Sequence, residues 1–212
     1  MILDVPEAVW PLVAVVVLVV LLAFIFRRTI EEVLLPRVSG VKVLGLEIQF
    51  AASQLRQASE KPDLSEKRAE PSKGDQKAAL ERAREAWPLL HGAEVLWVDD
   101  DPYGNRPERR MLQAFGVMID TVTTNDDATM MLRQHRYDVV ISDIRRSAGE
   151  SGLALAEQIA PPSPLAKPLI FYVTTLEPGT PPHAFAITNR PDHLLHYVID
   201  VLARWRRGVA RG

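Results

Sequence analysis

The chain of 212 residues carries 25 basic and 27 acidic side chains, which gives a formal net charge of −2. Without an excess of positive charge, general affinity for nucleic acid is not expected. The absence of cysteine excludes disulfides, thiolate metal sites and cysteine nucleophiles. Of the five histidines only His193 and His196 are close in sequence, and their spacing favours a solvated helix face over a zinc site.

The N-terminus is dominated by an uncharged run of 18 residues at 9–26. As a helix this run would extend roughly 27 Å, close to the hydrocarbon thickness of a bilayer. Acidic residues precede the run, and Arg27 and Arg28 follow it directly. This charge distribution predicts a single transmembrane helix in residues 1–28 of an inner-membrane protein, with the N-terminus outside and the remainder in the cytoplasm. A buried core helix and a cleaved signal peptide are the alternatives.

Residues 29–91 are expected to connect this anchor to a folded domain. Apolar residues alternate around Gly40 and Gly45, which predicts either a juxtamembrane hairpin or a segment lying on the membrane surface. The following residues, 54–84, are rich in charged and small side chains and are expected to form a solvated linker with helical stretches. Strong helix formers at 76–87 favour a helix that either packs on the next domain or pairs with a second copy.

Residues 92–212 alternate short apolar runs with amphipathic stretches. The runs expected to be strands lie at 95–98, 117–122, 139–142, 168–174 and 183–188, and helical stretches separate most of them. This alternation is typical of an α/β domain, here a doubly wound five-stranded parallel sheet covered on both faces. In such sheets functional residues gather at the carboxyl ends of the strands.

Two of the expected strands run directly into acidic residues. The first is followed by Asp99 and Asp100, and the third by Asp143. If these strands are neighbours, the three carboxylates converge, and like charges in one pocket repel each other unless a hard cation joins them. The sequence therefore predicts a Mg²⁺ site made of Asp99, Asp100 and Asp143, with Asn105 near it.

Several segments of this domain resemble the receiver domain of two-component response regulators. They are VLWVDDDP, YDVVISDI with Gly152 nine residues after its aspartate, PLIFYVTT, and the NRP before the last helix. The resemblance covers residues 94–207 and implies a flavodoxin-like fold with Asp143 as phospho-acceptor and Asp99 and Asp100 as Mg²⁺ ligands. Such chemistry is reasonable, because a carboxylate can attack a phosphoryl group when a metal neutralises the developing charge.

The sequence departs from the receiver pattern in three places. Receivers have a lysine before the proline that follows the fifth strand, and Arg190 takes that position, which keeps the charge but changes the donor geometry. The hydroxyl at the end of the fourth strand falls on Val173, so Thr174 can supply it only if the strand shifts by one residue. Residues 175–183 contain three prolines, which predicts that the fourth helix is short or missing.

Other residues near these segments have simpler expected roles. Trp97 in the first strand is expected in the core. Arg145 and Arg146, just past Asp143, are expected to be exposed loop charges, with contact to phosphate or a partner as the alternative.

The sequence therefore predicts a membrane-anchored, receiver-like signalling protein. It acts either as a pseudo-receiver adaptor or as a switch phosphorylated on Asp143, with no enzymatic activity beyond accepting and losing that phosphate. The alternative is a Mg²⁺-dependent hydrolase or nucleotide-binding enzyme using the same acids, although no glycine-rich phosphate loop supports it. The expected partners are the membrane, a kinase or output protein, and a second copy in a homodimer, but not nucleic acid.

Overall fold

The structure is a computed structural model that describes residues 35–60, 71–101, 103–146, 151–174, 176 and 179–209. The anchor predicted at 9–26 lies outside these residues. Within the ranges that are described, no helix is both long enough and apolar enough to cross a membrane. The chain divides into two compact units, residues 1–46 and 47–212, and the second contains the whole α/β domain.

Helix α3 (Leu35–Ser59) occupies the region around Gly40 and Gly45, so the hairpin predicted there is wrong. The apolar residues that alternate in sequence also include pairs three and four positions apart, and this spacing suits one face of a helix. The helix formers that follow, up to Ser59, extend the same helix. In the second compact unit, Ala51 and Leu55 from α3 are completely buried in the core.

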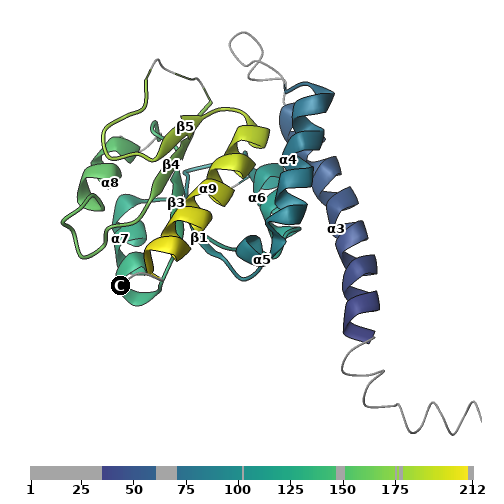
Figure 1. The fold of residues 1–212 in the computed structure, drawn as a ribbon. Coiled ribbons are helices and arrows are strands. Elements are labelled where there is room, and N and C mark those ends of the chain that lie inside the picture. Colours follow the sequence, from purple (N-terminus) through teal and green to yellow (C-terminus); the bar gives the residue numbers. More distant parts are fainter. Residues whose placement is uncertain are drawn as a thin grey trace, which may run out of the picture. The chain divides into compact units, whose positions relative to one another are not determined.

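The domain is built on a five-stranded sheet in which every pair of neighbouring strands is parallel (Figure 1). The strands are β1 (Glu94–Val98), β2 (Met118–Val122), β3 (Val139–Ser142), β4 (Leu169–Tyr172) and β5 (Ala186–Thr188). Their order is β2-β1-β3-β4-β5, which is the flavodoxin-like order shared by receiver domains. The fold class predicted from the sequence is thus confirmed, and the order reverses between β1 and β3.

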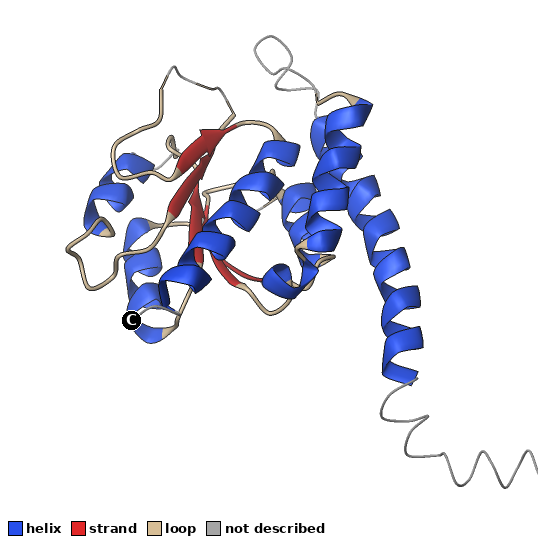
Figure 2. Ribbon diagram, viewed as in Figure 1, coloured by secondary structure: helices blue, strands red, loops and turns tan. Residues whose placement is uncertain are grey.

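Helices cover both faces of the sheet (Figure 2). On one face lie α6 (Arg106–Gln113) and α9 (Pro191–Val209), and on the other lie α7 (Asn125–Gln134) and α8 (Gly152–Gln158). Each face has its own cluster of buried apolar residues. Among the described residues between β4 and β5 no helix forms, as the prolines of this segment predicted.

Helix α4 (Lys73–Glu85) and the short helix α5 (Trp87–Leu90) belong to the domain. Helix α4 begins with a reciprocal cap, in which the Ser72 hydroxyl accepts from the Asp75 amide and the Asp75 carboxylate accepts from the Ser72 amide. Its Ala79 and Ala83 are completely buried in the cluster that includes α9. Of the two alternatives for this helix, packing on the domain is therefore the one observed (Figure 1).

Candidate functional site

The structure brings Asp99 and Asp143 to the same edge of the sheet. Val98 and Ser142 pair in register at the ends of β1 and β3, and each aspartate is the next residue along its strand. The Asp143 amide donates to the Val98 carbonyl over 3.2 Å, which continues the strand pairing to that point. Acidic side chains from two distant segments therefore meet where the strand order reverses, the usual position of a site in this fold.

The carboxyl of Asp143 at this edge has a raised pKa. Burial raises the pKa of its carboxyl to about 6, and the charges of Asp99 and Asp100 push it in the same direction. The amide of Arg145, 3.4 Å from Asp143 Oδ1, opposes this shift. The three carboxylates predicted from the sequence are therefore within electrostatic range of one another, and a bound cation would relieve their repulsion.

The neighbouring Asp99 is only 6% exposed, and burial raises the pKa of its carboxyl as well. Two hydrogen bonds from its own loop oppose that shift: the Asp101 amide donates to Asp99 Oδ1 over 2.8 Å, and the Asn105 side-chain amide donates to Asp99 Oδ2. Asn105 thus contacts one of the predicted acidic residues, and its part in a binding pocket stays a prediction. Both oxygens of Asp99 already accept hydrogen bonds from the protein.

The donors of this pocket have the chemistry that Mg²⁺ prefers, since they are carboxylate oxygens. In the part of the chain that the structure describes, however, no three acidic or histidine side chains are grouped closely enough to hold a metal ion. A Mg²⁺ ion bound by Asp99, Asp100 and Asp143 would have to draw these side chains together. This ligand set stays a prediction.

Arg190, at the position of the receiver lysine, is held by two carboxylates. Its Nε donates to Asp192 Oδ1 over 3.1 Å and its Nη2 to Asp192 Oδ2 over 2.6 Å, which is a bidentate ion pair. The same Nη2 also donates to Asp75 Oδ2 over 3.0 Å. Asp192 is 1% exposed, so the guanidinium neutralises a buried charge at the start of α9.

Thr174 does not take the position at the end of β4 where receiver domains have a hydroxyl. Strand β4 ends at Tyr172, and the buried Val173 continues its pairing by donating its amide to the Thr188 carbonyl over 3.0 Å. Thr174 is exposed. The strand is therefore not shifted in the way that would give Thr174 the position of the receiver hydroxyl.

The loop after β3 differs from the sequence-based prediction in one respect. Arg145 is exposed as expected, but Arg146 is 6% exposed and its guanidinium donates to the Asn125 side-chain oxygen. Arg145 forms an antiparallel bridge with Ser151, and Asn125 donates to the Ser151 carbonyl over 3.2 Å. The prediction of an exposed Arg146 is wrong, because the conformation of this loop packs the Arg146 side chain against Asn125 at the start of α7.

The contacts of two further charged residues on α6 were not predicted from the sequence. Glu108 is completely buried and accepts a hydrogen bond of 2.8 Å from the hydroxyl of Tyr172. The guanidinium of Arg109 lies over the ring of Trp97, with its carbon 5.7 Å from the ring centroid. Trp97 itself is in the core, as predicted. Charged residues near the start of a helix usually face solvent, so the sequence carries no signal for the burial of Glu108 or for the contact of Arg109 with Trp97.

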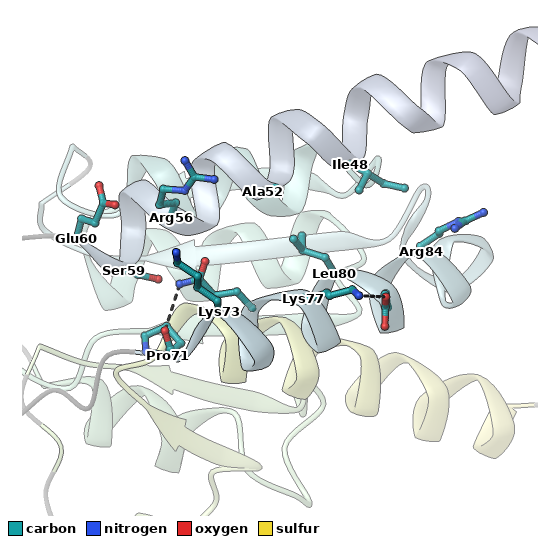
Figure 3. A pocket seen from close by; sticks show the side chains of 12 residues that line it. Ile48, Ala52, Arg56, Ser59, Glu60, Pro71, Lys73, Lys77, Leu80 and Arg84 are labelled. Atoms are coloured by element: carbon teal, nitrogen blue, oxygen red, sulfur yellow. Dashed lines mark hydrogen bonds and ion pairs between the residues drawn. The ribbon is translucent and has the colours of Figure 1, made fainter.

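A groove of about 840 Å³ lies between α3 and α4 in the second compact unit (Figure 3). Ile48 and Leu80 contribute apolar surface to it, and Arg56, Lys73 and Lys77 contribute positive charge. None of the residues predicted as site residues lines this groove. It is therefore a feature separate from the acidic pocket.

Comparison with known proteins gives matches to solved structures alone. No family model matches the chain, and no curated protein matches it either. One similar structure is the N-terminal domain of a response regulator/sensory box/GGDEF protein from Carboxydothermus hydrogenoformans, at 20% identity and a TM-score of 0.46, covering 55% of this chain and 98% of that one. Another is the response regulator TrrA of Thermotoga maritima in complex with Mg²⁺ and BeF, at 25% identity and a TM-score of 0.46, covering 51% and 98%. A third is the signal receiver domain of an HD domain-containing protein from Pseudomonas fluorescens, at 16% identity and a TM-score of 0.49, covering 57% and 95%.

Proposed function

We propose that this chain is a receiver-like signalling module that acts as an adaptor, transmitting a signal through protein contacts without cycling phosphate on Asp143. The observation that carries the proposal is the engagement of Arg190 by Asp192 and Asp75. Phosphoryl transfer to a carboxylate needs positive charge aimed at the transferred group. The guanidinium of Arg190, at the position of the receiver lysine, is instead hydrogen-bonded to Asp75 on α4 and Asp192 on α9.

The side chain at the end of β4 also supports an adaptor. The position of the receiver hydroxyl is taken by the apolar side chain of Val173. An apolar side chain there removes a hydrogen bond that a phosphoryl group would accept, and it leaves the fold intact.

The second candidate is a switch in which a partner kinase phosphorylates Asp143 with Mg²⁺ as cofactor. It is favoured by the position of Asp143 beside Asp99 and by its pKa of about 6, which burial raises most and the charges of Asp99 and Asp100 raise further. A bound cation would stabilise the ionised carboxylate. For this function Arg190 would have to leave Asp75 and Asp192. We favour the adaptor because it requires no such rearrangement. No observation on the described residues favours a hydrolase or nucleotide-binding enzyme.

Membrane attachment and pairing of copies complete the proposed function. The uncharged run at 9–26, followed by Arg27 and Arg28, supports a single-pass anchor in the inner membrane with the α/β domain in the cytoplasm. Confinement to a membrane raises the effective concentration of copies and so favours a homodimer. Fractionation of cells, with protease added from outside, tests this topology: release of the chain into the soluble fraction would contradict it.

The adaptor and the switch are separated by adding Mg²⁺ and beryllofluoride to the full-length protein and recording amide NMR spectra or tryptophan emission. The adaptor predicts no spectral change that depends on Asp143, so wild type and Asp143→Asn respond alike. A response of the wild type that Asp143→Asn abolishes would overturn the adaptor in favour of the switch.

A further inference from the structure

Arg109 of α6 lies next to the acidic pocket. Its guanidinium covers the ring of Trp97 at 5.7 Å, and Trp97 is 1% exposed. Trp97 lies in β1, and Asp99, the residue after β1, continues the strand pairing by donating its amide to the Val122 carbonyl over 3.0 Å. The side chains of Trp97 and Asp99 therefore point to the same side of the sheet. The guanidinium is therefore positioned by an aromatic ring that shares its side of the sheet with an acid of the pocket.

The pKa of the Arg109 guanidinium responds to burial and to nearby carboxylates. Burial lowers the pKa of its guanidinium, and the carboxylates of Asp99, Glu108 and Asp101 oppose this shift, with Asp99 the strongest of the three. The Arg109 side chain is thus removed in part from water and lies within electrostatic range of Asp99. A cation placed there offsets part of the negative charge that Asp99 contributes to the pocket.

Local hydrogen bonds hold the loop and the helix that carry this arrangement. The Asp101 carboxylate accepts from the amides of Tyr103 and Gly104 over 3.0 and 2.9 Å, which fixes the turn between β1 and α6. Glu108 is bound to the Tyr172 hydroxyl of β4, which fixes the first turn of α6 on the sheet. Arg109 follows Glu108 directly, so its backbone position is set by the same contacts.

We propose that Arg109 is an internal counter-ion of the acidic pocket and that it weakens the binding of a divalent cation there. The inference rests on the proposed receiver-like pocket of Asp99, Asp100 and Asp143. A guanidinium near Asp99 repels an incoming Mg²⁺ ion and reduces the negative potential that would attract it. Because phosphoryl transfer to a carboxylate needs the metal, the same residue also favours an adaptor over a phosphorylated switch.

The test is isothermal titration of the full-length protein with MgCl₂ and with MnCl₂. Arg109→Gln removes the charge, Arg109→Met removes it while keeping an apolar stem against Trp97, and Arg110→Gln removes the same charge from the next residue of the helix. Asp99→Asn in the Arg109→Gln background reports whether binding occurs in the pocket. Thermal melts of each variant by circular dichroism identify those that are folded.

The proposal predicts that Arg109→Gln and Arg109→Met each tighten binding on the order of tenfold, a size expected for removal of one charge close to a divalent ion in a partly buried site. Arg110→Gln is expected to bind the cation as the wild type does, and Asp99→Asn is expected to abolish the gain in affinity.

Equal affinities of wild type and both Arg109 variants would overturn the inference while leaving the proposed function intact. Absence of binding in every variant would overturn the inference together with the Mg²⁺ ligand set. Phosphorylation of Asp143 is a separate outcome that contradicts the adaptor alone.

Discussion

Arg190 and Asp75, which are 115 positions apart in the chain, are joined by a hydrogen-bonded ion pair of 3.0 Å. Arg190 lies two residues after β5 and directly before α9. Asp75 lies in the first turn of α4, where its carboxylate also accepts from the Ser72 amide over 3.1 Å. One carboxylate thus caps α4 and attaches it to the carboxyl end of the sheet. Helix α4, which precedes the first strand in the chain, is therefore connected to the edge of the sheet at which the acidic pocket lies.

Replacement of Arg190 by glutamine is expected to lower the free energy of unfolding by about 3 kcal/mol, because it leaves the Asp192 carboxylate buried without its bidentate partner. Urea denaturation at neutral pH measures this change. The added replacement Asp192→Asn removes the buried charge and should restore part of the lost stability. Equal stability of Arg190→Gln and wild type would show that the ion pair contributes nothing to the fold.

Docking of α4 on α9 depends on small buried side chains. Ala83 is completely buried, so Ala83→Glu would place a charge in the core and should detach α4, at a cost of about 3 kcal/mol. Hydrogen exchange of the α4 amides should accelerate while that of β1 and β3 stays slow. The control is Arg84→Glu on the exposed neighbouring position, for which slow exchange of α4 is expected. Unchanged exchange in Ala83→Glu would contradict the docking.

Gly152 is required by the close approach of the loop that follows Asp143. A methyl group at this position would overlap the Asp143 carbonyl and come within 3.0 Å of the Ile144 Cα. We therefore expect Gly152→Ala to destabilise the protein by about 2 kcal/mol. Gly74→Ala is the matched control, since its methyl would meet only Ser72 Oγ at 3.5 Å in the first turn of a helix. A melting temperature of Gly152→Ala equal to that of wild type would contradict the predicted overlap of the methyl group with the Asp143 carbonyl.

The stability of the protein should depend on the ionisation of Asp143. Its pKa is raised from 3.8 to about 6, so between these values the folded state binds more protons than the unfolded state. The free energy of unfolding therefore falls as the pH rises through this window, and Asp143 destabilises the fold at neutral pH. After allowance for solvent screening, Asp143→Asn should stabilise the protein at pH 7 by on the order of 1 kcal/mol.

Denaturation at pH 5 and pH 7 measures this effect. Asp143→Asn should flatten the pH dependence of the wild type, whereas the control Glu157→Gln, at an exposed position of α8, should keep it. A wild-type stability that increases from pH 5 to pH 7 through Asp143 would contradict the raised pKa.

The sheet could be predicted from the sequence because apolar runs such as those of β1 and β3 are short, buried and separated by helical periodicity. The meeting of Asp99 and Asp143 followed from the rule that parallel strands end at one edge. Helix α3 was misread because apolar residues at mixed spacings fit a strand and a helix alike. A local pattern of this kind is decided by packing, which the sequence does not display.

The directions of the arginine side chains could not be predicted. Arg109, Arg146 and Arg190 each have long side chains whose direction depends on partners that are distant in sequence, namely Trp97, Asn125 and Asp75. Residue type and spacing place such a charge near a site but do not say which carboxylate or ring it contacts. The acidic part of the candidate site was therefore accessible from the sequence, and its basic part was not.

The adaptor function is tested most directly by incubating the full-length protein with Mg²⁺ and acetyl phosphate and measuring its intact mass, with Asp143→Asn beside it. The account predicts that neither protein gains a phosphoryl group, because Arg190 is bound to Asp192 and Asp75. A phosphoryl adduct on the wild type that is absent from Asp143→Asn would contradict it.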